Sequence, residues 1–327
     1  MDAEIALEVR DARAEDREAV FAFCAQTWDD GDYIPSVWDN WLADTSGALL
    51  VGDADGQPVA LSHVRLMAPD EAWIEGVRVA PEMRRRGGGR VLISRSLVRA
   101  REMGATTARM FTGAANVASQ RLFERFGFQR IAEMAWYTAD ALPDDPATAV
   151  HVARPRTTAE LDPSIAETSR DTIQGALPTG ARLRAPGLGD FERLWDWLVQ
   201  SNLTPFNGGI EIHHWAGRAV SEPALRGYLA AGAVIELEER GAPQALAIVS
   251  DDRATWSEES DLEVRYMDGL SDAIGRLALL LRGEASRRGL ERVWLWLPDL
   301  LILRDAMDGA GYTRGEPDTM WVYAREL

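Results

Sequence analysis

The sequence predicts an α/β (α+β) protein made of two copies of one fold, and three observations support that prediction. Stretches with apolar residues at every second position, such as 73–79, predict β-strands. One of these strands leads through a glycine-rich loop into an amphipathic helix, residues 90–103. The second half of the chain repeats the layout of the first half. A chain of 327 residues is also long enough for two domains, each with its own core.

The elements of the first half follow from these patterns. Pro58 and Pro81 punctuate the strands, and Asp53–Gln57 forms the turn of a hairpin. Cys24 lies among apolar helical neighbours and is expected to be a core residue. In order, we expect strands over residues 5–11, 48–51, 58–67, 73–79, 106–112 and 129–137, and helices over 14–28, around Trp38, Trp41 and Leu42, and over 90–103.

Composition and charge exclude several classes of protein. The net charge of −17 argues against nucleic acid and anionic membranes as partners. No apolar run approaches the ~20 residues of a membrane span, and the acidic start Met1–Glu4 lacks the build of a signal peptide. We therefore expect a cytoplasmic protein. A single cysteine excludes an internal disulfide, and the absence of lysine excludes acetylation of its own lysine side chains.

The loop between the strand 73–79 and the following helix is the most informative stretch. It reads Arg84-Arg85-Arg86-Gly87-Gly88-Gly89-Arg90. A helix N-terminus offers unpaired N–H groups, glycines let an anion approach the backbone, and arginines add charge-assisted donors. A P-loop needs a lysine that the chain lacks, and a Rossmann fingerprint needs a glycine where Leu92 stands. The alternative to an anion site is a solvated basic turn.

Two motifs in the right order resemble a known family. The first is Arg84-x-x-Gly87-x-Gly89 after Val79-x-Pro81, and the second is Asn116-x-x-Ser119-x-x-x-Phe123-x-x-x-Gly127-Phe128. Over about residues 6–137, this pattern resembles the GCN5-related N-acetyltransferases (GNAT). The resemblance implies a mixed, mostly antiparallel twisted sheet flanked by helices. It departs at Phe123, where the family usually has a tyrosine.

The resemblance also implies the co-substrate, acetyl-CoA, and a set of residues that hold it. In this family the co-substrate lies in a split between the fourth and fifth strands, so the fourth strand's backbone runs along it. The implied cofactor-binding residues are Val77, Val79, Arg84, Arg85, Arg86, Gly87, Gly88, Gly89, Arg90, Asn116, Ser119 and Phe123.

Transfer to an amine needs a base, because an alkylammonium must lose a proton before it can attack. Glu75 is our candidate, since the family often places a glutamate there; Glu133, Tyr33 and Asp32 are the fallbacks. The alternative for Glu75 is a structural ion pair with Arg78 or Arg109. Because Phe123 cannot donate a proton to the departing thiolate, we expect a water, Ser119 or Tyr137 to replace part of that function.

The loop Asp29–Pro35 would border the acceptor pocket, as the resemblance implies. Its three aspartates and Tyr33 suit an amine, so Asp32 and Tyr33 are candidate substrate-binding residues. The alternative is a polar turn and helix cap. His63, in the second hairpin strand, is interpreted as a packing residue.

The chain divides into a first domain over residues 1–139, a linker over 140–179 and a second domain over 180–327. The second domain is a degenerate copy. Its counterpart of the arginine-glycine loop, Tyr266–Asp272, has no arginine and two added carboxylates, which would repel a pyrophosphate. His213-His214 lacks the companions of a metal site, so packing is favoured and no metal is expected.

The leading functional hypothesis is an acetyl-CoA-dependent N-acetyltransferase that transfers acetyl directly, in a ternary complex, to a small amine or free amino acid. Gly31–Pro35 and Glu75–Pro81 look similar to the histidine N-acetyltransferase-like group, which favours a small acceptor. The alternatives are an acetyl-CoA-binding protein with little turnover and an acetyltransferase of protein N-termini or lysines. A monomer or a homodimer is compatible with the sequence, which does not identify the acceptor.

Overall fold

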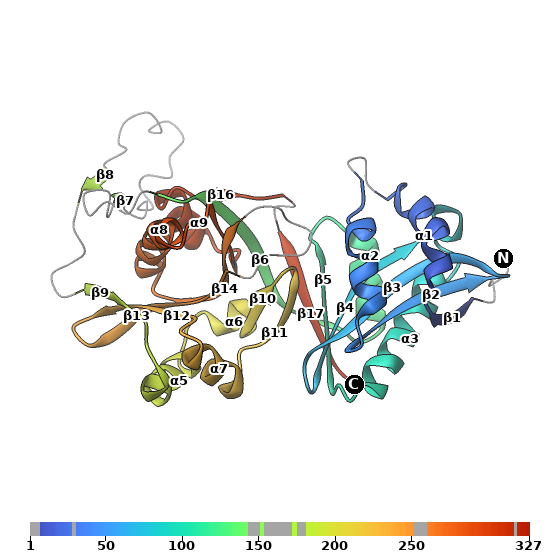
Figure 1. The fold of residues 1–327 in the computed structure, drawn as a ribbon, viewed down its shortest axis with the longest axis horizontal. Helices are drawn as coiled ribbons and strands as arrows, with labels where there is room; N and C mark the ends of the chain where they lie inside the picture. Colours follow the sequence, from blue (N-terminus) through green and yellow to red (C-terminus); the bar gives the residue numbers. More distant parts are fainter. Residues whose placement is uncertain are drawn as a thin grey trace. The chain divides into compact units, whose positions relative to one another are not determined.

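The computed structural model describes residues 7–27, 31–142, 151–153, 172–174, 181–251, 260–316 and 319–327. These residues fall into two compact units (Figure 1). The first unit comprises Met1–Arg130, Trp215–Arg218 and Val322–Leu327, and the second comprises Ile131–His214 and Ala219–Trp321.

The first unit is built on a mixed sheet. The strand order is β1 (Glu8–Asp11), β2 (Gly47–Ala54), β3 (Gln57–Ala68), β4 (Glu71–Val79), β5 (Thr107–Gly113) and β17 (Met320–Glu326). Strands β1 to β4 pair antiparallel, whereas β4 and β5 pair parallel. Two parallel neighbours need a crossover connection, and α3 (Gly88–Glu102) provides it between β4 and β5.

Helices cover both faces of this sheet (Figure 1). On one face, α1 (Arg17–Cys24) and α2 (Ile34–Ala43) bury Cys24 and Trp38 in a cluster with Leu61 of β3. On the other face, α3 approaches so closely that the Ser96 and Ser62 hydroxyls lie 2.9 Å apart. The short helix α4 (Val117–Arg125) follows β5. No helix in the described part of the chain is long and apolar enough to cross a membrane.

The second unit repeats this strand succession. Its sheet order is β9 (Ala181–Arg184), β12 (Val234–Glu239), β13 (Ala242–Ser250), β14 (Asp261–Gly269), β15 (Arg292–Pro298) and β6 (Gln129–Asp140). Here too a parallel pair, β14 with β15, is bridged by a long helix, α8 (Ser271–Arg287). The remaining elements are α5 (Phe191–Val199), α6 (Thr204–Asn207), α7 (Glu222–Ala230), α9 (Leu301–Gly309) and strands β7 (His151–Ala153), β8 (Thr172–Gln174), β10 (Ile210–His213), β11 (Ala216–Ala219) and β16 (Thr313–Arg314).

The predicted fold class, helices on mixed, mostly antiparallel sheets, is confirmed. The predicted strands and helices of the first half all occur, with ends displaced by a few residues; α1, for example, ends at Cys24. Cys24 is fully buried, as expected. Residues 5–6 of the first predicted strand, Asp29, Asp30 and most of the predicted linker (143–150, 154–171 and 175–180) lie outside the described residues.

Each compact unit takes its last strand from the other half of the sequence. Apart from its first two residues, β6 belongs to the second unit, where Met134–Asp140 pair antiparallel with Arg292–Pro298 of β15. Most of β17 belongs to the first unit, and Figure 1 shows this red strand beside the green β5. The compact units therefore do not follow the predicted boundaries, 1–139 and 180–327, which remain a prediction about the sequence repeat.

Candidate active site

The first feature of the site is a split in the sheet of the first unit. Strand β4 pairs with β5 only from Glu71 to Trp73, and then continues to Val79. The backbone from Ile74 to Val79, which includes the predicted Val77 and Val79, has no ladder partner on β5 among the described residues. A bulge in this stretch coincides with Gly76, which has φ +63° and whose added Cβ would lie 2.6 Å from the Trp41 ring. Only glycine fits there.

The second feature is the loop that joins β4 to α3. Arg84, Arg85 and Arg86 are exposed, and the chain turns through positive φ at Arg85 (62°) and Gly87 (90°). Helix α3 starts at Gly88, after Gly87 as its N-cap. Among the backbone hydrogen bonds of the described residues, none uses the N–H of Gly87, Gly88 or Gly89 as donor. Open N–H groups at a helix N-terminus beside arginines suit a pyrophosphate.

The predicted base, Glu75, lies on the free stretch of β4. Its Oε1 accepts a hydrogen bond from His63 Nδ1 at 2.9 Å and lies 3.0 Å from Arg65 Nε. The side chain is 12% exposed, so it borders solvent. The alternative that Glu75 pairs with Arg78 or Arg109 is wrong, because Glu75 lies beside Arg65 instead. Arg78 binds Asp32, and Arg109 binds Glu71, because in each case that carboxylate is closer in space.

His63 connects Glu75 to a second carboxylate. Its side chain is 1% exposed, stacks on Trp41 at 4.5 Å between ring centroids, and directs Nε2 at Asp44 Oδ2, 3.6 Å away. Burial alone would lower the pKa of His63, but Asp44 and Glu75 outweigh it and the pKa is raised. His63 and two hydrogen bonds from Ser46 hold the pKa of Asp44 well below its usual range. His63 therefore does more than fill the core.

The two predicted acceptor-binding residues, Asp32 and Tyr33, differ in exposure and in their partners. The Asp32 side chain is 1% exposed and accepts hydrogen bonds from Arg78 Nε (2.7 Å) and Nη2 (3.1 Å) and from the Ile34 N–H. It is thus committed to an ion pair and a helix cap, the alternative that the sequence left open. Tyr33 is 46% exposed, packs edge-on against Trp41 and has the Arg78 guanidinium over its ring at 5.2 Å.

The second motif shapes the start of α4. Asn116 is the N-cap, and its side chain accepts from the Ser119 N–H at 3.2 Å. Phe123 is 3% exposed and packs against Phe128 and Tyr323 of the same unit. The fallbacks Glu133 and Tyr137 belong to the second unit; Tyr137 is in its core, where burial raises the pKa of the phenol to about 12.

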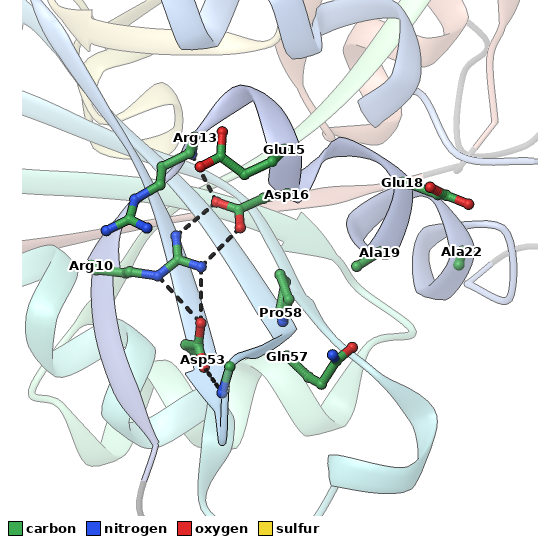
Figure 2. A pocket seen from close by; sticks show the side chains of 11 residues that line it. Arg10, Arg13, Glu15, Asp16, Glu18, Ala19, Ala22, Asp53, Gln57 and Pro58 are labelled. Atoms are coloured by element: carbon green, nitrogen blue, oxygen red, sulfur yellow. Dashed lines mark hydrogen bonds and ion pairs between the residues drawn. The ribbon is translucent and has the colours of Figure 1, made fainter.

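Two other polar clusters contain none of the predicted site residues. An open hollow of about 630 Å³ surrounds Arg10, which bridges Asp16 and Asp53, and Figure 2 shows that its walls contain none of the predicted site residues. In the second unit, Glu263 bonds His213 and the His214 N–H. The Arg265 guanidinium lies 3.7 Å from Glu263 and already supplies a positive charge there.

The sequence interpretation missed the environment of Glu75, namely His63, Arg65 and Asp44. A signal for part of it was present, because the hairpin joined at Pro69-Asp70 brings His63 near Glu75. Counting back across that turn places His63 opposite Gly76, and a one-residue register shift between Leu66 and Ala68 moves it opposite Glu75. No sequence pattern predicted the contact between Asp44 and His63, because it forms only when α2 packs on the sheet.

Comparison with known proteins agrees with this geometry. Residues 8–128 match the model of the acetyltransferase (GNAT) family. The chain is 27% identical over 239 residues to human probable N-acetyltransferase 16, covering 71% of this chain and 58% of that protein. It is 31% identical over 83 residues to histidine N-acetyltransferase of Oreochromis niloticus, 25% of each chain. It is 29% identical over 110 residues to L-2,4-diaminobutyric acid acetyltransferase of Nocardia farcinica, 32% of this chain and 57% of that protein. The chain thus spans at most 58% of the length of these curated relatives.

Two solved structures share the fold along nearly the whole chain. A GCN5-related N-acetyltransferase from Sphaerobacter thermophilus superposes with a TM-score of 0.59 at 14% identity, covering 98% of this chain and 95% of the other. A putative acetyltransferase from Thermoplasma acidophilum gives 0.53 at 16% identity, covering 98% and 100%. Residues 8–128 therefore match the acetyltransferase (GNAT) family, and the fold is shared along nearly the whole chain.

Proposed function

We propose that this protein is an acetyl-CoA-dependent N-acetyltransferase whose acceptor is a small amine or a free amino acid. The observation that carries the proposal is a single continuous segment. Strand β4 leaves β5 after Trp73, presents Glu75 on its free stretch and leads directly into the arginine-glycine loop at the N-terminus of α3. An activated acyl donor with a pyrophosphate and an acceptor amine can meet on such a segment.

The residues of the first unit fit acetyl-CoA as the donor. The N–H groups of Gly87 to Gly89 and the exposed Arg84, Arg85 and Arg86 would hold the pyrophosphate. The backbone at Val77 and Val79, which has no ladder partner on β5 among the described residues, would accompany the rest of the molecule along β4. When bound, acetyl-CoA supplies an acyl group on a thiolate leaving group.

Glu75 would act as the base toward the acceptor. Its carboxylate borders solvent, and Arg65 and His63 orient it through Oε1. The acceptor's ammonium must lose a proton to become a nucleophile, and a positioned carboxylate can take that proton directly or through one water. Because Asp32 is occupied by Arg78, Glu75 is the better candidate for this role.

Arg65 and two relatives of this chain bear on the identity of the acceptor. Arg65 lies beside Glu75 and is 28% exposed, so a carboxylate on the acceptor could pair with it while the amine faces Glu75. This arrangement favours amino acids, and two relatives are named for histidine and 2,4-diaminobutyric acid as acceptors. The exposed Tyr33 would border the acceptor.

The test is thiol release from acetyl-CoA across a panel of amino acids, diamines and peptides. Glu75→Gln is expected to lower kcat by about 10²–10⁴-fold with little change in acetyl-CoA affinity. The matched control is Glu71→Gln, because Glu71 lies on the same strand and is also paired with an arginine. Release with peptides alone would favour the protein-acceptor alternative. Tight acetyl-CoA binding without release for any acceptor would favour a binding protein, in keeping with Phe123.

A further inference from the structure

His63 is the most unusual polar group near the site, because it is a buried histidine between two carboxylates. Nδ1 contacts Glu75 at 2.9 Å and Nε2 faces Asp44 at 3.6 Å. The other charged group against this cluster is Arg65 of β3, 3.0 Å from Glu75; Arg78 of β4 is taken up by Asp32. The cluster thus runs from Glu75, inside the split, to Asp44, whose side chain is 24% exposed.

Gly47 leaves the space in which Asp44 and His63 meet. A Cβ added to Gly47 would lie 2.3 Å from Asp44 Oδ2 and 2.8 Å from His63 Nε2. The backbone at Gly47 is ordinary strand, so alanine is compatible with its conformation. The steric restriction at this glycine therefore concerns one contact, the one between Asp44 and His63.

Trp41 holds the imidazole in the orientation that this chain of groups needs. The two rings stack with an interplanar angle of 14°. The imidazole plane is thereby fixed, so its two nitrogens point at different carboxylates rather than turning toward solvent. A histidine needed only to fill the core would not require a carboxylate at each nitrogen, since buried carboxylates are costly to desolvate.

We propose that His63 and Asp44 position the carboxylate of Glu75 as the base, a role that rests on the proposed transferase function. The acceptor's N–H bond breaks and its proton forms an O–H bond with Glu75, which borders solvent and releases the proton to water. His63 keeps the proton on Nδ1 that it donates to Glu75 Oε1, and Asp44 holds the imidazole from the Nε2 side at 3.6 Å. Charge and atoms balance, and Glu75 returns to the carboxylate.

His63 and Asp44 are positioning residues, because they act through Glu75. The variants are Asp44→Asn, His63→Gln and Gly47→Ala, where the last displaces Asp44 without changing any ionisable group. Each is expected to lower kcat at least 10-fold, to alter the pH profile of kcat and to leave both KM values within about twofold. Glu71→Gln is the control and keeps the wild-type profile.

A readout without turnover is the titration of His63 followed by NMR. The chain has four histidines, so the His63 signal is identified by its loss in His63→Gln. Asp44→Asn and Gly47→Ala are expected to move its titration to lower pH, and an unchanged titration would overturn the positioning role. Thiol release by wild type with normal kcat and pH profile in Gly47→Ala and Asp44→Asn would overturn the positioning role alone. No thiol release by wild type would overturn the transferase function and the positioning role with it.

Discussion

In each unit a strand leads through a loop into the helix that bridges a parallel strand pair: β4 into α3 in the first unit, and β14 into α8 in the second. The two connections have the same architecture, but the residues that precede each helix differ in charge and burial. In the first unit, exposed arginines and Gly87 precede the helix. In the second unit, Asp268 and Gly269 precede it, and Asp268 is buried and bonded to Ser201 and Tyr266. Burial raises the pKa of Asp268.

The difference shows that the fold does not depend on the anion site. Apolar faces of the sheet and the crossover helix stabilise both units, since α8 buries Ile274, Leu277 and Leu281 as α3 buries Leu92, Ile93 and Leu97. The loop between strand and helix is free to carry either arginines or buried carboxylates. The proposed pyrophosphate contacts therefore depend on a few loop residues of the first unit.

The largest expected effect comes from removing the arginines that distinguish the two loops. Replacing Arg84, Arg85 and Arg86 together by alanine should weaken acetyl-CoA binding by about 10²–10³-fold, because charge-assisted hydrogen bonds contribute about 1.5–3 kcal/mol each and are not additive. Calorimetric titration measures this. Asp272→Ala in the second loop is the control and should leave affinity unchanged. Equal affinity in the triple variant would contradict the anion site.

The next effect tests whether Asp32 is structural. Asp32→Ala removes the carboxylate that accepts two hydrogen bonds from Arg78 and should lower the free energy of unfolding by about 3 kcal/mol. Asp39→Ala breaks the exposed pair with Arg17 and should cost less than about 1 kcal/mol. Denaturant midpoints measure both. If Asp32→Ala instead unfolds normally but raises the acceptor KM, Asp32 binds substrate as first predicted.

A pH series compares Asp44 of the first unit with Asp268 of the second, because their pKa values are shifted in opposite directions. A lowered pKa contributes stability above the unfolded value of about 3.9 that is lost as pH falls, so Asp44→Asn should cost about 1–2 kcal/mol at pH 6 and less near pH 3. A raised pKa contributes stability at low pH that is lost as pH rises, so Asp268→Asn should be relatively more favourable at pH 7 than at pH 3. Parallel trends for the two variants would refute this contrast.

The smallest effect concerns the family's usual tyrosine. Phe123→Tyr places a hydroxyl among Phe128 and Tyr323, which should lower the free energy of unfolding by about 1–2 kcal/mol. We expect kcat to change by less than about 10-fold, because a thiol of pKa about 8.5 leaves without a strong acid. Stopped-flow or steady-state thiol release measures it. A gain of 100-fold or more would show that the missing acid limits the reaction.

Local sequence was enough to predict much of the site. The alternation of 73–79, the three glycines and the apolar stripe of the following helix each depend on neighbours within a few residues, and β4, the loop and α3 occur where they were expected. The choice of Glu75 as the candidate base, which stays a prediction, came from the resemblance to the acetyltransferases, which often place a glutamate on this strand. The ion-pair partners of the arginines near Glu75 were harder to predict. Arg78 is close to Glu75 in sequence and Arg109 lies on the neighbouring strand, yet they bind Asp32 and Glu71.

By itself, the sequence determined the order of strands and helices, the arginine-glycine loop and the loss of that loop from the second half, because periodicity, glycine and charge act locally. Only the tertiary structure decided that Asp44 meets His63, that Asp32 is taken up by Arg78, and that β6 and β17 each complete the sheet of the unit formed mainly by the other half. These features join residues far apart in the chain. Such contacts depend on how helices and strands pack and on which charged groups this packing brings together, and a local sequence pattern does not predict either.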